Sequence, residues 1–323
     1  MAMLTVEDLR IYYATPLGHV KAVDGVSFEV REGEVFGIAG ESGCGKSTLV
    51  HSLILRKPPM VHMGGKAIFK GKDLMTMSPK ESRKIRYTEL SIIPQYAMNA
   101  LNPTKKIKDI VWDLAMEHGY TDKNEIEKLL RERLEMVKLS PKVAEMYPVE
   151  LSGGMRQRAT MVVSTLLNPD LLIADEVTSA LDVTTQRVVI ELLHHFMKEG
   201  IVKSIIFVTH DLALLDKIAD RIMIMYAGKV AEIGPTDEVI NEPSHPYTQL
   251  LLNSLPRMGV QYKRQKLKGI PGYPISLLNP PKGCRFYTRC PYALDKCPHE
   301  EPKPVKVGEE HYVACHLLGG ESQ

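Results

Sequence analysis

Residues 40–48 read GESGCGKST, and this stretch constrains the fold more than any other part of the 323-residue chain. It matches the phosphate-binding pattern Gly-x4-Gly-Lys-Ser between EVFGIAG, typical of a buried strand, and STLVHSLIL, typical of a helix. Glycines let consecutive backbone N–H groups point at an anion, and the helix adds its positive dipole end. A plain glycine turn could carry the same letters, but the strand–loop–helix context favours nucleotide binding.

The loop predicts specific contacts with a nucleotide. We expect Lys46 to reach the β- and γ-phosphates and the Ser47 hydroxyl to ligate Mg²⁺. Cys44 is interpreted as a small space-filling residue and neither a ligand nor a nucleophile. The loop residues predicted to bind the nucleotide are Gly40, Glu41, Ser42, Gly43, Cys44, Gly45, Lys46, Ser47 and Thr48.

A second apolar run, LLIADE at 171–176, ends in two acidic residues. An acidic pair at a strand end is common on protein surfaces, but a phosphate-loop protein needs one at this place. We expect Asp175 to hold Mg²⁺ through water and Glu176 to polarise the attacking water as a general base.

Strand and helix patterns alternate along the chain, which predicts an α/β fold with a mainly parallel sheet. LTVEDLRIYY and VSFEV are typical of strands, with the turn-rich TPLGHVKAVDG between them. SIIFVTH indicates another buried strand, GKVAEIG a late hairpin arm, and residues 104–147 carry helical periodicity.

Charge and hydropathy exclude several classes of function. The 41 basic and 39 acidic residues leave a net charge of +2, which gives no footprint for nucleic acid. The N-terminal residues lack a signal-peptide pattern, and no apolar run is long enough to span a bilayer.

The segment LSGGMRQR at 151–158, directly before a helical run, resembles the signature motif of ABC-type ATPases. Other motifs of that family follow the same order along roughly 200 residues. The matching positions are Tyr13 for stacking on adenine, Gln95 of the Q-loop, Ser179-Ala180-Leu181-Asp182 of the D-loop, and the switch residue His210. The resemblance implies an ABC cassette over residues 1–255, with a RecA-like core, an antiparallel β subdomain and a helical subdomain.

The resemblance also implies how ATP is used. In the family, the signature reaches the ATP held by a second subunit, so Ser152, Gly153 and Gly154 are expected to contact a partner's nucleotide. Asp182 is expected at that nucleotide site too. Gln95 is expected to ligate Mg²⁺ and sense the γ-phosphate, and His210 to stabilise charge. Val177 stands where the family usually has proline, which predicts a less rigid turn without loss of hydrolysis.

Four of the five cysteines lie within the last 40 residues, at Cys284, Cys290, Cys297 and Cys315. The surrounding segment has few apolar residues, so four thiols there suggest a metal that staples it. Structural zinc sites usually have closer pairs, whereas wider spacings suit a [4Fe–4S] cluster. The spacing leaves Zn²⁺ and the cluster open, with two disulfides as a third option.

The C-terminal residues carry a second resemblance. The segment from Ile270 to Cys315, with Ser244-His245-Pro246-Tyr247-Thr248 before it, resembles the extension of ATPase subunits of oligopeptide and dipeptide importers. From Pro256 the composition becomes rich in proline and glycine, which predicts a linker into a small Cys-rich module within residues 256–323. The resemblance implies a structural [4Fe–4S] cluster there. We interpret His299, His311 and His316 as solvated or as lying behind the metal ligands.

Together these resemblances imply an ATPase subunit that drives uptake of di- or oligopeptides. The implied partners are a second ABC ATPase subunit (a paralogue or a second copy), two transmembrane permease subunits and an extracytoplasmic substrate-binding protein, with no nucleic acid. The expected location is the cytoplasmic face of the membrane. The alternatives are the same machinery importing oligosaccharides or nickel, a soluble ABC ATPase without a transport role, or a redox protein that merely binds nucleotide.

Overall fold

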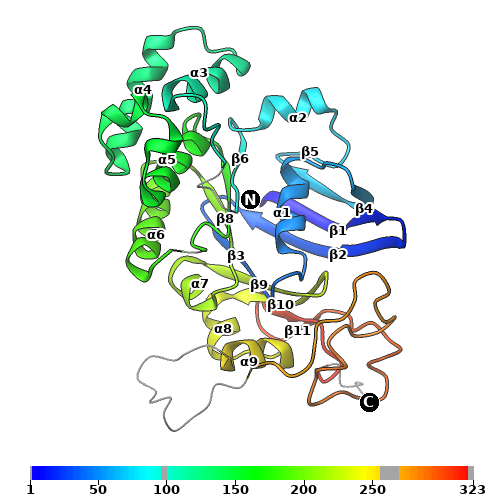
Figure 1. The fold of residues 1–323 in the computed structure, drawn as a ribbon. Helices are drawn as coiled ribbons and strands as arrows, with labels where there is room; N and C mark the ends of the chain where they lie inside the picture. The colour runs from blue at the N-terminus through cyan, green and yellow to red at the C-terminus, as the bar shows by residue number, and fades with distance from the viewer. Residues whose placement is uncertain (1, 96–99, 180, 255–268, 319–323) are drawn as a thin grey trace. The chain divides into compact units, whose positions relative to one another are not determined.

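The structure is a computed structural model, and it describes residues 2–95, 100–179, 181–254 and 269–318. The chain forms two compact units that interleave along the sequence (Figure 1). Unit 1 comprises Met1–Val30, Val35–Met75 and Thr209–Gln323, and unit 2 comprises Arg31–Glu34 and Thr76–Val208.

Unit 1 contains an antiparallel sheet with the strand order β2-β1-β4-β5. Its strands are β1 (Ala2–Thr15), β2 (Gly18–Arg31), β4 (Met60–Phe69) and β5 (Lys72–Asp73). The pairing of β1 with β4 runs from Leu4 opposite Phe69 to Tyr13 opposite Met60, with an irregular register between Glu7 and Ile11. Because side chains alternate along a strand, one face of β1 is buried and the other stays partly exposed.

A second set of strands in unit 1 follows the order β11-β12-β10-β9-β3. Its members are β3 (Val35–Ala39), β9 (Arg221–Tyr226), β10 (Lys229–Pro235), β11 (Val305–Lys306) and β12 (Tyr312–Val313). β3 and β9 are parallel, and β9 and β10 form an antiparallel hairpin. The helices of this unit are α1 (Lys46–Ile54), α7 (Leu212–Ile218), α8 (Thr236–Asn241) and α9 (Pro246–Asn253).

Unit 2 has three parallel strands in the order β8-β7-β6. They are β6 (Leu90–Ile93), β7 (Leu171–Asp175) and β8 (Ser204–Val208). All residues of β7 and β8 are buried, as expected for parallel strands that are covered on both faces. The helices are α2 (Pro79–Ile85), α3 (Ile107–Glu117), α4 (Lys123–Met136), α5 (Gly153–Thr165) and α6 (Val183–Lys198), with short 3-10 turns at Pro141–Glu145 and Pro148–Glu150.

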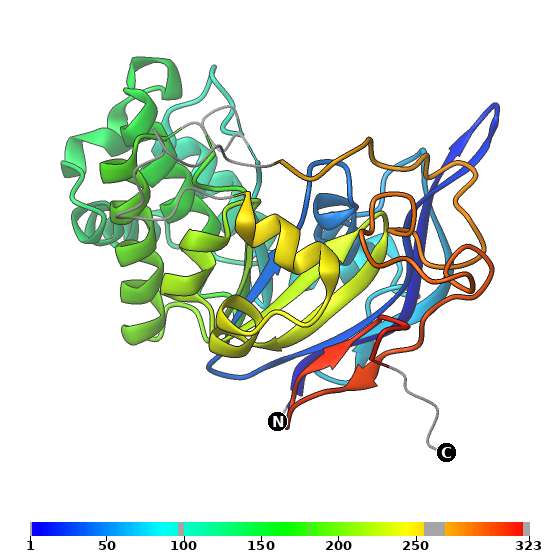
Figure 2. The ribbon, with the colours of Figure 1, turned by 90° about the horizontal axis from the view of Figure 1, so that it is seen from below.

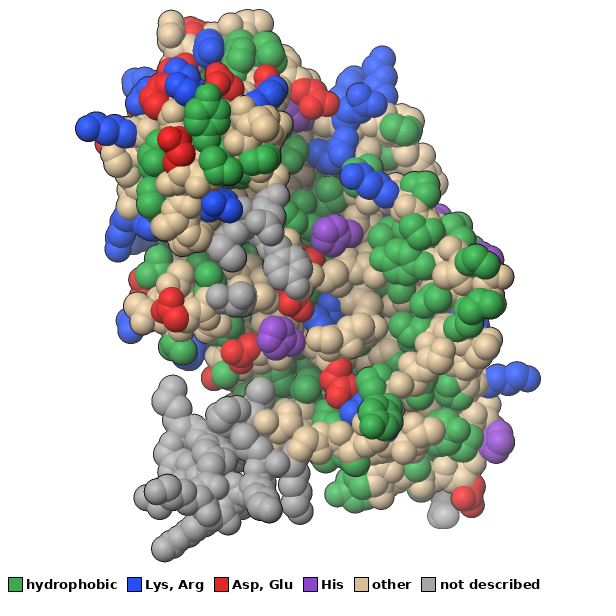
Figure 3. Space-filling view, in the orientation of Figure 1, with side chains coloured by type: hydrophobic (Ala, Val, Ile, Leu, Met, Phe, Trp, Pro, Cys, Tyr) green, Lys and Arg blue, Asp and Glu red, His purple; other side chains and the backbone are tan. Residues whose placement is uncertain are grey.

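Acidic and basic side chains interleave over the helical part of unit 2 (Figure 3). Ion pairs such as Lys108 with Glu145, at 2.8 Å, contribute to this mixture. No described helix is both long enough and apolar enough to cross a bilayer.

Most elements lie where the sequence predicts them, with two differences. The stretch TPLGHVKAVDG was expected to be rich in turns, but from Gly18 onward it belongs to β2, so this expectation is wrong. Pairing with β1 outweighs its turn-forming residues.

The second difference concerns the C-terminal residues. The cysteine-rich segment belongs to unit 1, and β12 pairs with β10 through Glu232 opposite Val313. Figure 2 shows β11 and β12 in red beside this hairpin. The structure therefore does not support a separate cysteine-rich module. The boundary expected at residues 255–256, and most of the linker, lie outside the described residues.

Candidate nucleotide-binding site

The phosphate loop lies in unit 1, between the end of β3 and the start of α1. The Lys46 side chain folds back into the loop, where its ammonium donates to the carbonyl oxygens of Gly40 at 2.8 Å and Glu41 at 3.1 Å. Lys46 is only 4% exposed, so the charge is held at a defined point inside the loop. This geometry gives the loop a positive centre directly beside the N-terminus of α1.

Two glycines are required by the close packing of the loop. A Cβ at Gly40 would lie 2.2 Å from the Met225 oxygen, and one at Gly45 would lie 2.1 Å from the Ala22 oxygen. Both residues also have positive φ, at 146° and 109°, which disfavours other amino acids. Only glycine fits the loop at these two positions.

Three other residues predicted to contact the nucleotide, Tyr13, Cys44 and His210, also lie in unit 1. Tyr13 lies in β1, and its hydroxyl is 3.1 Å from the Thr48 hydroxyl of α1. Cys44 is buried, and burial raises the pKa of its thiol, in keeping with its interpretation as a space-filling residue. His210 is exposed and directly precedes Asp211, the N-cap of α7.

In unit 2, the two predicted acidic residues lie at the end of β7. Asp175 is the last residue of the strand and is fully buried. Glu176 leaves the strand with φ at +47°, a strained value for a residue with a side chain, and its N–H donates to the Val208 oxygen at 2.9 Å. Backbone strain of this kind is concentrated at functional sites.

The Glu176 carboxylate receives two hydrogen bonds at one oxygen. The Gln95 amide donates at 3.0 Å and the Ser179 hydroxyl at 2.9 Å. The structure therefore brings together the predicted base, the predicted Q-loop glutamine and the first residue of the D-loop. Sequence reasoning did not predict the Ser179 contact, although its position three residues after Glu176 suits such a bond.

The signature segment forms the start of α5. Ser152 is the N-cap, its hydroxyl accepts the Met155 N–H at 3.4 Å, and Gly153 and Gly154 open the first turn. A Cβ at Gly154 would meet no atom within 4 Å, so this glycine is not required by packing inside the chain. The turn offers backbone N–H groups and a helix dipole to an anion.

The turn after Glu176 is anchored despite the missing proline. Val177 is buried, and its oxygen accepts a hydrogen bond from the Gln157 side chain of α5.

Asp182 of the D-loop caps α6 by accepting the Thr185 N–H at 3.0 Å, and hydrogen bonds from Thr185 lower the pKa of its carboxyl. Ala180 of the D-loop lies outside the described residues.

The four C-terminal cysteines share one local pattern, in which each sulfur accepts a backbone N–H. The donors are Phe286 for Cys284, Tyr292 for Cys290, Leu294 for Cys297 and Leu317 for Cys315. Burial, with smaller contributions from the other three thiols, raises the pKa of Cys284 to about 11.

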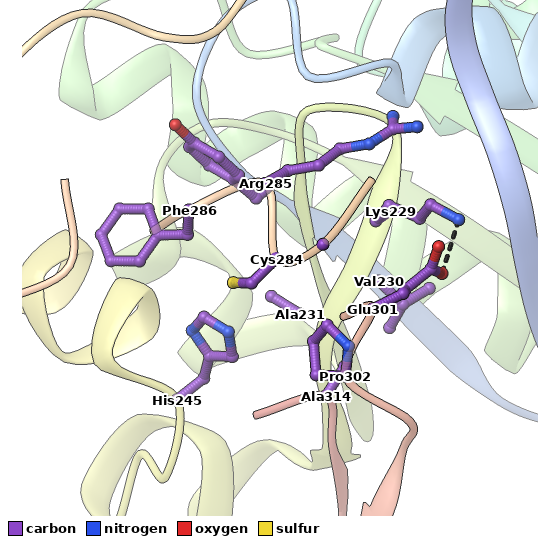
Figure 4. A pocket seen from close by; sticks show the side chains of 12 residues that line it. Lys229, Val230, Ala231, His245, Cys284, Arg285, Phe286, Glu301, Pro302 and Ala314 are labelled. Atoms are coloured by element: carbon purple, nitrogen blue, oxygen red, sulfur yellow. Dashed lines mark hydrogen bonds and ion pairs between the residues drawn. The ribbon is translucent and has the colours of Figure 1, made fainter. Parts of the chain in front are cut away.

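Within the described residues, no three His, Cys, Asp or Glu side chains are grouped closely enough to hold one metal ion. The thiols are nevertheless near enough that the other three raise the pKa of Cys284. A cavity of about 50 Å³ adjoins Cys284, whose sulfur points toward Phe286 and His245 (Figure 4).

His311 differs from its interpretation as a solvated or supporting residue. It is buried, with Nε2 at 2.7 Å from a Glu232 oxygen and Nδ1 at 3.1 Å from a Glu238 oxygen. Its role is to join the segment before β12 to β10 and α8. The structural reason is the register of β12 beside β10, which sequence spacing does not reveal.

Comparison with known proteins matches these features to a family. Residues 23–179 match the family model described as ABC transporter. The dipeptide transport ATP-binding protein DppD of Caldanaerobacter subterraneus subsp. tengcongensis is 43% identical over 98% of this chain and 97% of its own length. The chain belongs to the ABC transporter ATP-binding proteins. It is an ABC-type ATPase, which confirms the resemblance seen in the sequence.

Further similarities extend across this ABC protein. The oligopeptide transport ATP-binding protein OppD of Bacillus subtilis is 41% identical over 98% of this chain and 89% of its own length. Residues 231–297 match the oligopeptide/dipeptide transporter C-terminal region. A dimeric ATP-binding cassette solved with ADP and Pi has a TM-score of 0.64 at 25% identity, covering 72% of this chain and 99% of its own. The ABC cassette fold is thereby confirmed.

Proposed function

We propose that this chain is the ATP-hydrolysing subunit of an importer for dipeptides or oligopeptides. The observation that carries the proposal is the extent of similarity, since relatives named for dipeptide and oligopeptide transport match nearly the whole chain. The match of residues 231–297 to a C-terminal region named for the same transporters adds support. Residues 1–255 serve as the nucleotide-binding part and residues 256–323 as the C-terminal part.

Each unit has its own proposed roles. In unit 1, Lys46 and the loop N–H groups hold the phosphates, Ser47 ligates Mg²⁺, and Tyr13 stacks on adenine. In unit 2, Asp175 holds Mg²⁺ and Glu176 acts on the attacking water. The bonds from Gln95 and Ser179 orient the Glu176 carboxylate and support this role.

Six further residues are assigned, two to the transition state and four to the partner's nucleotide. Gln95 contacts the metal and the γ-phosphate side, and His210 stabilises charge on the transferred group. Ser152, Gly153, Gly154 and Asp182 contact the nucleotide of a second ATPase subunit. Gly154 supports this assignment, because the space where its Cβ would lie is open to a partner.

The proposed assembly places this subunit at the cytoplasmic face of the membrane. There it pairs with a paralogue or a second copy and docks on two permease subunits, which receive cargo from an extracytoplasmic substrate-binding protein. Binding of ATP closes the pair and hydrolysis lets it open, so chemical energy drives a rigid-body switch.

The test of the proposed function is transport by the reconstituted complex. Proteoliposomes that contain the chain with its co-purifying membrane subunits should take up labelled peptide only with ATP and Mg²⁺. The Glu176→Gln variant should bind ATP normally but lose nearly all turnover and uptake, because its amide cannot accept the proton. Full turnover in that variant would remove the base role, and uptake of sugar or nickel instead of peptide would reassign the cargo.

We also propose that Cys284, Cys290, Cys297 and Cys315 hold a [4Fe–4S] cluster. The N–H donor at each sulfur supports this, because such bonds stabilise thiolates bound to a metal. The cluster would supply four covalent anchors to a segment that has few apolar residues, a structural role. The raised pKa of the Cys284 thiol means that ligation must displace a proton.

Metal analysis of anaerobically purified protein tests the cluster. The expected result is brown protein with about four irons per chain and absorption near 400 nm. The variant Cys44→Ala is the matched control, since this cysteine lies outside the set and should leave the iron content unchanged. Colourless protein with one zinc per chain would assign Zn²⁺ instead.

A further inference from the structure

Arg289, one residue before Cys290, forms a two-pronged ion pair with the phosphate loop. Its guanidinium donates to the two carboxylate oxygens of Glu41, at 2.6 and 2.9 Å. The Arg289 side chain is 3% exposed and that of Glu41 is 25% exposed. Water and salt therefore screen this pair weakly, and its geometry is the strong, parallel form of an arginine–carboxylate contact.

The backbone of Glu41 is held from other sides. Its N–H donates to the Tyr247 hydroxyl at 2.8 Å, and Tyr247 is fully buried at the start of α9. Its carbonyl oxygen accepts the Lys46 ammonium at 3.1 Å and the Cys44 N–H at 3.2 Å. Glu41 thus joins the C-terminal segment and α9 to the lysine that is proposed to hold the phosphates.

Arg289 is itself fixed by several contacts. Its Nε donates to the Pro271 oxygen at 2.8 Å, and one terminal nitrogen donates to the Tyr226 hydroxyl at 3.3 Å. The Tyr226 ring packs against that of Tyr247, with centroids 4.7 Å apart. The guanidinium is therefore pre-organised, and it cannot follow Glu41 if the loop moves without breaking these contacts.

The contact between Arg289 and Glu41 also has an electrostatic role. Glu41 puts a carboxylate on a loop that is proposed to bind phosphates, and like charges at short range repel. Arg289 neutralises that carboxylate and holds it on the side of the C-terminal segment. Without the arginine, a partly buried negative charge would remain on the loop.

We propose that Arg289 is a positioning residue for the phosphate loop, so that nucleotide affinity depends on the seating of the cysteine-rich segment. The proposal rests on the proposed nucleotide-binding role of residues 40–48. Because Arg289 and Cys290 are adjacent, whatever fixes Cys290 also fixes the arginine that neutralises Glu41.

The experiment measures binding of a fluorescent ATP analogue to the full chain. We compare wild type with Arg289→Met, Glu41→Gln and the double variant, and thermal unfolding verifies that each is folded. Arg289→Met should raise the Kd about tenfold, because it leaves the carboxylate unpaired. The double variant should return to within about threefold of Glu41→Gln, since no charge is left to repel phosphate.

Arg285→Met is the matched control. Arg285 lies one residue after Cys284, is equally buried, and pairs with Asp24 and the Ala227 oxygen instead of the loop. This variant should lower the unfolding temperature but change the Kd by less than about threefold. If Arg289→Met does not fold, Arg289→Lys replaces it, because lysine keeps the charge but loses the two-pronged geometry.

Two outcomes would overturn the proposal. An unchanged Kd in Arg289→Met would show that the ion pair does not set nucleotide affinity. If Arg289→Met loses affinity and adding Glu41→Gln does not restore it, Arg289 only stabilises the fold. Lys46→Ala separates this failure from that of the proposed function. If Lys46→Ala still binds the analogue at wild-type affinity, residues 40–48 are not the binding loop.

Discussion

At the scale of single residues, the same histidine that marks the Ser244–Thr248 segment has a structural task. His245 caps α9 by accepting the Tyr247 N–H at 3.0 Å on Nδ1. Burial lowers its pKa to about 4. The ring is therefore neutral at physiological pH, and it helps place Tyr247 beneath the phosphate loop.

Acid is expected to destabilise the protein through this histidine. Between pH 6.5 and about 4 the unfolded chain binds a proton that the folded chain does not, so the free energy of unfolding rises with pH across this window. The full effect is about 3 kcal/mol. His245→Asn keeps an N-cap acceptor but does not titrate, so its unfolding free energy should depend less on pH.

Denaturant unfolding of wild type and His245→Asn from pH 4 to 7 measures how the free energy of unfolding depends on pH in each protein. The other titrating groups are common to the two proteins, so the difference between the two slopes of unfolding free energy against pH isolates His245. Equal slopes would show that the histidine is already protonated or already exposed in the folded state.

At the scale of elements, helix N-termini recur at the proposed phosphate contacts. α1 begins at Lys46 after the glycine loop, and α5 begins at Gly153 after the cap Ser152. The two helix starts differ in whether packing inside the chain requires their glycines. Gly40 and Gly45 are required by close backbone contacts inside unit 1, whereas Gly154 faces open space.

Two substitutions of Ser152 separate its capping role from its proposed role on a partner's ATP. Ser152→Ala removes the cap and should lower the free energy of unfolding by about 1 kcal/mol. Ser152→Asp keeps a cap that suits the helix dipole, so stability should be preserved. Its carboxylate would repel the partner's phosphate, however, so hydrolysis by the assembled pair should fall at least about tenfold.

Unfolding curves and ATPase rates of the assembled complex check both expectations. Nucleotide binding by the isolated chain serves as the control, because Ser152 does not belong to its own phosphate loop. Wild-type hydrolysis by Ser152→Asp would remove the proposed contact with the partner's nucleotide.

At the scale of the whole molecule, the C-terminal segment is part of unit 1, which contains the proposed phosphate loop. Arg285 and Arg289 are the first and last residues of the stretch between the first two cysteines. Arg285 pairs with Asp24 and Arg289 pairs with Glu41, both in the N-terminal part of the chain. Truncation before the cysteines would therefore remove the arginine partners of both carboxylates, although Asp24 would keep the hydrogen bond from the Tyr12 hydroxyl. The C-terminal residues thus complete unit 1, because they pair with groups that it already buries.

ATP is expected to pair this chain with a second ATPase subunit. With ATP and Mg²⁺, the Glu176→Gln variant should form a stable pair with its partner subunit, because ATP stays bound at the shared site. Light scattering should show the doubled mass, and Lys46→Ala should abolish the pairing. Solitary chains under all these conditions, with co-purifying subunits supplied, would contradict a shared nucleotide site.

The sequence by itself determined the local chemistry and the order of elements. The glycine loop between a strand and a helix, the buried strand that ends at Asp175, and the cap before α5 each depend on residues close together in the chain. Their local turns and helix dipoles follow from short-range sterics, which is why the patterns predicted them. The long β2 was missed, because pairing with β1 outweighs its turn-forming residues.

Only the tertiary structure decided which distant residues meet. Glu41 and Arg289 are 248 positions apart, and His311 reaches Glu232 across 79 positions. No periodicity or spacing encodes such pairs, because they depend on how β12 pairs with β10 and on where the C-terminal segment packs. The separate cysteine-rich module expected from composition was not supported for the same reason: its buried arginines find their partners among N-terminal residues of unit 1.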